Sequence, residues 1–479
     1  MTERTSQMKR TKRRLDGQRI RPHVVDVEKR VREILFEPLR KNILSAIIPD
    51  FVFKSGDQEI SAPAQLLRHE DEFQFTLHFN SGRPPTELQS ARGGFFNDAD
   101  KKTIRGQING EIGFRCDDVF PPSKMTTRSR GTSITVLNSH RMHLVAEGTD
   151  AMTTNEVRKL IGKTTEAEHQ EKVGFTAQLI YHGPKLKMFG AGTEVTTRND
   201  FLGDAASSSA DTHQFEAETW EGALIQQGPE LHLHLRSRKQ ADVDHSAEEI
   251  TDMIDRANQA VGFVLGFNPW PAYREVRIDH KVVERWLSPS FDLPTTYLTP
   301  VSESMWVHFL SDTDNVFHKI IPIVTDGLER IPESDRAKLA KILWHFRSGT
   351  NRELPSSTRL LILCAVIDGL MKLIAGAGDP KNTATDKTWR KASDTLGLSW
   401  DRWTKGVFEV WGKHRHLLAH GWLWLGEEMD AQEFFSDHAR LGCAFLTFVA
   451  AFCGYEGPIM ADPFKNRIIT ISEIKSRPS

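Results

Sequence analysis

The spacing of apolar positions along this chain changes its period at about residue 300. Before that point, apolar side chains recur at every second position between clusters of glycine, proline, asparagine and aspartate. This alternation is typical of β-strands, because successive side chains of a strand point to opposite faces. Strands are predicted in the ranges 47–54, 72–79, 103–114, 133–147, 174–188, 218–236 and 275–286. The region 34–290 is therefore predicted to be β-rich, as a sandwich or a barrel.

One helix is predicted among these strands, over residues 246–265. Ser246 is a good N-cap residue, and Glu248 and Glu249 follow in the first turn, where the helix dipole favours negative charge. Apolar residues then recur at helical spacing until the GFNPWP sequence at 266–271, which ends the helix.

After residue 300 the apolar residues recur at the three- and four-residue spacing of helices. The predicted helices are 302–320, 334–346, 357–374, 400–421 and 436–453. The third is apolar on nearly every side, so it is expected to lie buried at the centre of a compact antiparallel bundle. The predicted fold class is α+β and multidomain, with a β-rich N-terminal region followed by a helical bundle over residues 301–460.

Three further segments complete the predicted organisation. Residues 1–33 form a charged lead, expected to be flexible, that holds the densest basic cluster of the chain. Residues 291–300 belong to the proline-marked stretch 288–300 and are predicted to be a linker between the two regions. Residues 461–479 are expected to form a C-terminal tail.

The composition limits the function classes. A chain of 479 residues with 39% hydrophobic and 26% charged residues is ordinary for a soluble protein. Its net charge of -2 provides no overall attraction to nucleic acid, so any RNA contact depends on local basic patches. The four cysteines contain no C-x-x-C pair, which favours reduced thiols in a cytoplasmic protein. No run of eighteen apolar residues predicts a membrane span, and no motif predicts a nucleotide, metal or other cofactor.

The candidate chemistry lies in the sequence KHRHLLAHGWLW at residues 413–424, at the end of the fourth predicted helix of the bundle. His420 suits a general base, because histidine has an unperturbed pKa near neutrality. Arg415 suits the stabilisation of negative charge on a phosphate, because its planar guanidinium stays protonated and binds two oxygens at once. On a straight helix these two residues would point about 140° apart. They converge if the helix ends or distorts near Gly421, or if a second copy of the chain completes the site.

The spacing of Arg415 and His420 resembles the R-x-x-x-x-H signature of HEPN-type ribonucleases. The sequence RLLILCAVIDGLMKLI at residues 359–374, followed by a loop and then RHLLAHGWLW, is similar to the ApeA-like group of that superfamily. The resemblance implies that Arg415 and His420 are the catalytic pair and that His416 occupies the polar position after the arginine. Asp368 matches the acidic residue that many such bundles carry in the buried helix. It either orients Arg415 or His420 or simply faces solvent.

The resemblance also implies the partners. Such nucleases act as homodimers that cut RNA without a metal, leaving a 2′,3′-cyclic phosphate and a 5′-hydroxyl. Single-chain members serve in abortive infection against phage, which implies a phage-derived trigger, a β-rich region with a sensing or regulatory role, and tRNA or another single-stranded or looped RNA as substrate. Lys413 and His414 are candidates to hold RNA phosphates, and Trp422 either stacks on a base or packs into the bundle.

Two other hypotheses stay open at this point. The bundle can serve RNA contact or dimerisation without cutting, while the β-rich region binds a protein, glycan or nucleic-acid ligand. In a third hypothesis His232, His234 and His245 form a metal site, although two histidines on one face of a strand are more often structural.

Overall fold

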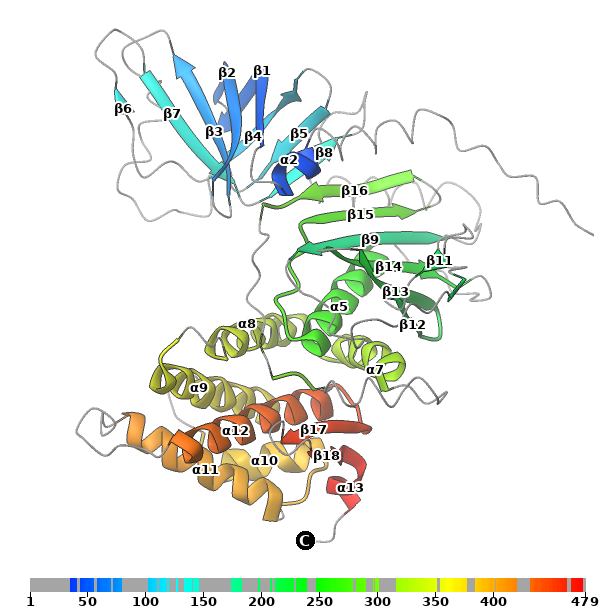
Figure 1. Ribbon diagram of the computed structural model, residues 1–479, viewed down its shortest axis with the longest axis vertical. Coiled ribbons are helices and arrows are strands. Elements are labelled where there is room, and N and C mark those ends of the chain that lie inside the picture. The colour runs from blue at the N-terminus through cyan, green and yellow to red at the C-terminus, as the bar shows by residue number, and fades with distance from the viewer. Residues whose placement is uncertain are drawn as a thin grey trace, which may run out of the picture.

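The fold was analysed in a computed structural model of the whole chain. It describes residues 35–40, 44–55, 58–69, 72–79, 102–109, 112–117, 119, 126–127, 133–139, 141–145, 174–182, 197–198, 207–208, 212–227, 230–238, 247–278, 281–289, 296, 298–300, 316–350, 354–376, 384–400, 402–419, 431–462 and 467–476. The fold is α+β, with an antiparallel sheet followed by a helical region, as the change of apolar period predicts. Figure 1 shows the sheet at one end of the molecule and the helices at the other.

The sheet is a continuous antiparallel ladder in the order β12-β13-β14-β9-β15-β16-β8-β5-β4-β1-β2-β3-β7-β6. Within the described residues β12 and β6 end this ladder without pairing to each other, so the sheet is open and the barrel alternative is wrong. The strands are β1 (Ser45–Ser55), β2 (Gln58–His69), β3 (Glu72–Phe79), β4 (Lys102–Ile108), β5 (Ile112–Cys116), β6 (Thr126–Thr127), β7 (Ser133–Ser139), β8 (Met142–Val145), β9 (Phe175–His182), β12 (Thr212–Glu216), β13 (Trp220–Gln227), β14 (Glu230–Ser237), β15 (Tyr273–Ile278) and β16 (Lys281–Leu287).

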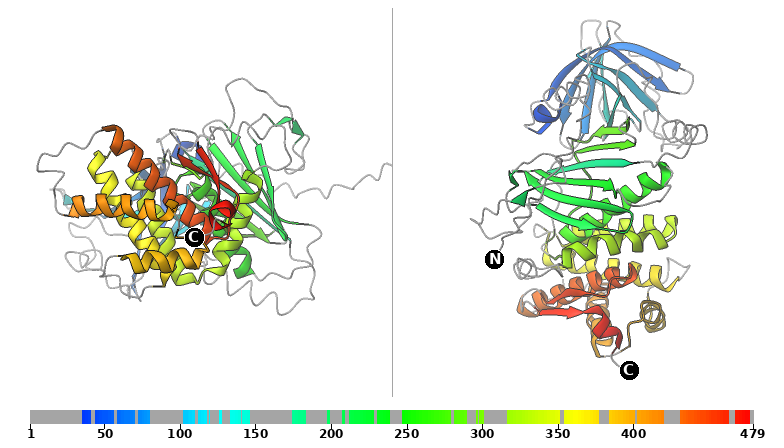
Figure 2. Two further views of the ribbon diagram at one scale, coloured as in Figure 1. Left: turned by 90° about the horizontal axis from the view of Figure 1, so that it is seen from below. Right: turned by 90° about the vertical axis from the view of Figure 1, so that its right-hand side faces the viewer.

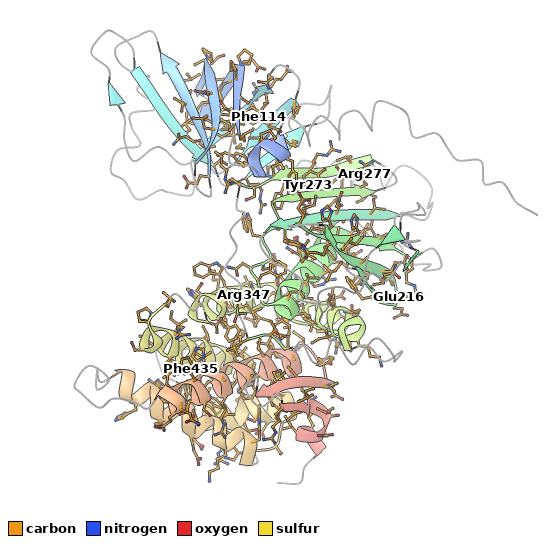
Figure 3. The ribbon with its side chains drawn as sticks, in the orientation of Figure 1. Phe114, Glu216, Tyr273, Arg277, Arg347 and Phe435 are labelled. Carbon is orange, nitrogen blue, oxygen red and sulfur yellow. The ribbon has the colours of Figure 1, made fainter. Side chains whose placement is uncertain are left out.

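The sheet consists of two lobes with separate cores. The first lobe, β1 to β8, buries Phe51, Phe75 and Phe114 on its inner side, together with the short helix α2 (Glu37–Arg40). The second lobe, β9 to β16, packs its apolar side against helices. The lobes join where β16 pairs with β8 over the two residue pairs Trp286–His143 and Leu287–Met142. Figure 3 labels Phe114 inside the first lobe and Tyr273 at the start of β15.

Helix α5 (Ala247–Leu265) lies on the second lobe, and α7 (Val316–Arg330) packs against both α5 and β12 (Figure 2). Gly327 of α7 approaches the backbone of Cys453 so closely that no Cβ fits there. The remaining helices form the bundle: α8 (Glu333–Gly349), α9 (Ser356–Ala375), α10 (Asp386–Leu396), α11 (Arg402–Ala419) and α12 (Ala431–Phe452). One apolar core extends without a break from the second lobe through α5 and α7 into this bundle.

Helix α9 is central, as its apolar composition predicts. It contacts α8, α10, α11 and α12, and Leu360, Ile367, Leu370 and Met371 are completely buried. No helix of the described residues is long and apolar enough to cross a membrane.

Several predicted elements differ from the structure in their bounds. The ranges 103–114, 133–147 and 218–236 each contain two strands. The first and the third are antiparallel hairpins, and Asn109, with φ of 53°, lies at the turn between β4 and β5. In the second range β7 pairs with β3 and β6, whereas β8 pairs with β5 and β16. The range 275–286 is likewise the hairpin of β15 and β16. The helix expected at 302–320 is described only from Val316 and continues through Pro322 to Arg330, because its apolar residues are buried in the core.

Several elements of the structure have no counterpart among the predictions, among them β2 and α10. Strand β2 lies between β1 and β3, and α10 packs on α9. Helix α10 buries Trp389 completely against Phe408, Trp411 and Phe448, although its sequence is mostly polar. Its buried face consists of Trp389, Ala392, Ser393 and Leu396 at helical spacing, a short stripe that the prediction missed.

The described residues of the predicted linker and the predicted C-terminal tail are packed against the rest of the fold. Thr296 donates a backbone hydrogen bond to Gly266, Leu298 is buried in the shared core, and Pro300 accepts from the backbone of Met460. The hairpin of β17 (Pro458–Asp462) and β18 (Arg467–Thr470) and the helix α13 (Ile471–Ser476) occupy the expected tail. Residues 1–33 lie outside the described residues, so the flexible lead stays a prediction.

Buried arginines join the second lobe to helices in two different ways. Arg274 of β15 pairs with Asp255 of α5 and lies 3.0 Å from a carboxylate oxygen of Glu284. Arg347 of α8 is only 4% exposed, and its Nη1 donates to the Asn268 side chain at 3.0 Å. Among the described residues no carboxylate pairs with Arg347, and burial lowers the pKa of its guanidinium to about 9. Figure 3 places Arg347 on the side of α8 nearest the second lobe.

The same substitution is therefore expected to act differently at these two arginines. Removing Arg274 leaves two carboxylates facing a buried site without a cation, so Arg274→Met should lower the free energy of unfolding by about 3 kcal/mol. Arg347→Met removes a desolvated charge that has no opposite charge, so the free energy of unfolding should stay within about 1 kcal/mol of wild type or rise. Urea unfolding of both variants measures this difference. Equal losses in the two would contradict it.

A pH dependence is expected from His438 of α12. Burial, and then the charge of Arg359, lower the pKa of His438 to about 4 from its ordinary value of 6.5. Between these values the unfolded chain binds a proton here that the folded chain does not. The free energy of unfolding should therefore fall as the pH falls, by about 1 kcal/mol for each pH unit in that window.

Urea unfolding of His438→Gln at pH 7 and pH 5, beside wild type, tests this prediction. The variant should lose less stability than wild type between the two pH values. His345→Gln, at an exposed position of α8, is the matched control and should lose as much as wild type. An unchanged loss in His438→Gln would show that another group is responsible.

Candidate functional site

The candidate site is built around the C-terminal half of α11, which packs between α9 and α12. Trp411 is 3% exposed, and its indole nitrogen donates to the carbonyl oxygen of Cys364 in α9 at 3.0 Å. Its ring also contacts Trp389 and Phe408, with centroids 5.3 Å and 5.8 Å away. This buried tryptophan anchors one side of α11 to the centre of the bundle.

Arg415 lies one helical turn after Trp411 and is partly exposed. Its guanidinium carbon is 5.4 Å from the centroid of the Trp411 ring, at a distance typical of a cation–π contact. Burial raises the pKa of the Cys364 thiol to about 12, while the positive charge of Arg415 acts to lower it. The arginine is thus held at the α9 side of α11 with part of its side chain open to solvent.

The partner that the motif assigns to Arg415 is not among the described residues. His420 and Trp422 lie outside them, so the convergence of Arg415 and His420 and the role of Trp422 stay predictions. The backbone is helical from Arg402 to Ala419, so α11 continues to the residue directly before His420. His416 follows Arg415 on this helix and is exposed.

His414 differs from its predicted role. Its side chain has no exposed surface, and its Nε2 lies 2.6 Å from Oδ2 of Asp437 in α12. A side chain with no exposed surface cannot reach an RNA phosphate, so the prediction that His414 contacts RNA is wrong for this structure.

Lys413 is exposed and pairs with Glu433, and its Nζ lies 3.9 Å from Oδ2 of Asp437. Two acidic residues of α12, one turn apart, therefore face the two basic residues that precede Arg415. Exposed ion pairs of this kind contribute little to stability, but they offset the positive charge available to a phosphate. Arg415 and His416 follow these two residues on the helix; Arg415 is partly exposed and His416 is exposed.

Asp368 makes local contacts on α9. One carboxylate oxygen accepts from the backbone nitrogen of Ala384 at 2.7 Å, and the other lies 2.8 Å from Nζ of Lys372. These contacts hold the start of the segment before α10 against α9. Whether Asp368 also orients Arg415 or His420, or mainly faces solvent, stays a prediction, because His420 lies outside the described residues.

The histidines considered for a metal site lie in β14. His232 is 2% exposed, and its Nε2 is 2.9 Å from Oε2 of Glu230. Its ring stacks on that of His234 at a centroid distance of 6.0 Å, and burial lowers the pKa of His234 to about 4. His245 lies outside the described residues, and those residues contain no group of three or more possible metal ligands.

Asp437 and Glu433 are site residues that the sequence did not reveal. They lie on α12, about twenty residues beyond their partners, and nothing in the spacing of charges marks them as neighbours of Lys413 and His414. The one usable signal is their separation by four residues on an amphipathic helix, which places both on one face.

Known proteins add nothing to this geometry. Comparison with protein-family models, with curated proteins and with solved structures found no match to this chain, so its family is not established by similarity and any function must be argued from the residues themselves.

Proposed function

We propose that this chain is a metal-independent endoribonuclease of the HEPN type, acting in the cytoplasm as a homodimer. The observation that supports it best is Arg415, a permanently charged side chain held on the last turns of α11 by Trp411 and partly open to solvent. A guanidinium in such a setting suits the recognition of a phosphate, because two of its N–H groups bind two oxygens together.

The proposed reaction is an attack of the ribose 2′-hydroxyl on the adjacent phosphorus. His420 takes the proton of that hydroxyl, and Arg415 stabilises the charge that develops on the phosphate oxygens. The bond to the 5′-oxygen then breaks, and that oxygen needs a proton; His420 of a second copy provides the donor. The products are a 2′,3′-cyclic phosphate and a 5′-hydroxyl.

The sheet has the regulatory role in this proposal. Unrestrained RNA cleavage harms the cell that makes the enzyme, so the activity needs control. The second lobe shares one apolar core with the bundle through α5 and α7. A ligand that changes the conformation of the sheet can therefore affect α11 through this packed core. The resemblance suggests anti-phage defence, with a phage-derived trigger and tRNA or another looped RNA as the substrate.

The test is RNA cleavage in EDTA by wild type, Arg415→Ala and His420→Ala, with total RNA and tRNA and with the product ends mapped. Both substitutions should lower cleavage at least about 100-fold, because each removes a group that acts on the transition state. Lys405→Gln is the matched control, since it removes an exposed ion pair with Glu409 on the same helix. That variant should cut as wild type does.

The assay should also be run in extracts of phage-infected cells, where a trigger is present. Equal activity in all four proteins would exclude the assigned pair. Inactivity of all four under both conditions would favour the alternative, a binding or scaffold protein whose bundle contacts RNA or a partner without cutting.

A further inference from the structure

The pair of His414 and Asp437 is the buried polar contact nearest to Arg415 on α11. His414 is the residue directly before Arg415, and Asp437 is 15% exposed at its side chain. Nε2 of His414 is 2.6 Å from the carboxylate, whereas Nδ1 is buried and has no hydrogen-bond partner among the described residues. The mechanism proposed above uses neither residue.

The direction of this hydrogen bond follows from its two partners. A carboxylate oxygen accepts, so Nε2 of His414 carries the hydrogen of this short contact. His414 therefore donates to Asp437 and connects α11 to α12.

This hydrogen bond defines which way α11 faces. Successive residues of a helix point about 100° apart, so anchoring His414 to α12 sets the direction of Arg415. Trp411 anchors the same turns to α9 through its bond to the Cys364 carbonyl. Helix α11 is thus held by α9 and by α12 on neighbouring sides, and Arg415, one turn after Trp411, is partly exposed.

We infer that His414 and Asp437 form a positioning pair that fixes the rotation of α11 and thereby holds Arg415 in the orientation needed at the phosphate. The catalytic part of this inference rests on the proposed function. The structural part does not, because the tie between α11 and α12 exists whatever the protein does.

The experiment compares Asp437→Asn, His414→Asn and His414→Gln with wild type in the full-length chain. The amide nitrogen of glutamine can stand near the place of Nε2 and still donate to Asp437. Asparagine is too short to do so and mimics only the Nδ1 side of the ring. His414→Gln is therefore the rescue variant, and Lys405→Gln again serves as the control on the same helix.

Two readouts are needed. Hydrogen exchange of the backbone amides of residues 411–416 shows whether the contact between α11 and α12 is intact, and it does not depend on RNA cleavage. Steady-state cleavage of RNA, corrected for the folded fraction at each condition, separates kcat from KM.

We expect His414→Asn to speed that exchange about 10-fold or more and to lower kcat about 10- to 100-fold, with KM within about twofold of wild type. Asp437→Asn keeps a side-chain oxygen that accepts from Nε2 of His414, so its effects should be smaller than those of His414→Asn. His414→Gln should stay within about threefold of wild type in both readouts. A role in stability alone would lower the folded fraction and leave the corrected kcat unchanged.

Unchanged exchange in His414→Asn would overturn the inference, whatever the cleavage assay shows. So would a glutamine variant as impaired as His414→Asn, or a corrected kcat equal to that of wild type in a chain that cuts RNA. If the wild type cuts no RNA and the exchange still rises as expected, the tie between α11 and α12 is supported and the proposed nuclease function fails.

Discussion

The constraint on which the helical region depends is the need of α9 for apolar neighbours on nearly every side. Its residues leave almost no polar face, so a soluble fold must surround it. Four helices do so, and the loops between them place α11 and α12 side by side at the end where α9 begins. The position of Arg415 follows from this arrangement, because Trp411 reaches the α9 backbone at Cys364.

Because the second lobe and the bundle share one apolar core, no clear boundary separates the sheet from the bundle. Helices α5 and α7 each bury one face against the second lobe and another against the bundle. The first lobe differs, since it has its own core and meets the second lobe through a short strand pairing. At that junction Arg141 lies over the rings of Trp270 and Trp286, at 4.8 Å and 4.3 Å. The first lobe is thus the part of the described sheet joined to the rest by the fewest paired residues. A ligand acting there would have to transmit its effect through this junction.

Much of the fold was accessible from the sequence because apolar periodicity survives in single elements. The strands β1, β3 and β9 and the helices α5, α8 and α9 each carry a local pattern of period two or 3.6, and their places were predictable within a few residues. Some hairpins were predicted as single strands, because a tight turn such as the one at Asn109 does not interrupt the alternation of apolar and polar residues. Helix α10 was not predicted, although Trp389, Ala392, Ser393 and Leu396 form a short buried stripe at helical spacing.

The sequence by itself determined the class of the fold, the central position of α9 and the identity of the candidate pair, because composition and spacing are local properties. Only the tertiary structure decided what surrounds that pair. It buried His414 against Asp437, paired Lys413 with Glu433 and brought the backbone nitrogen of Ala384 to the Asp368 carboxylate. These contacts join residues from separate helices, or residues and backbone brought together by a loop. Their formation depends on how helices rotate to bury apolar faces, and no spacing along the chain encodes that rotation.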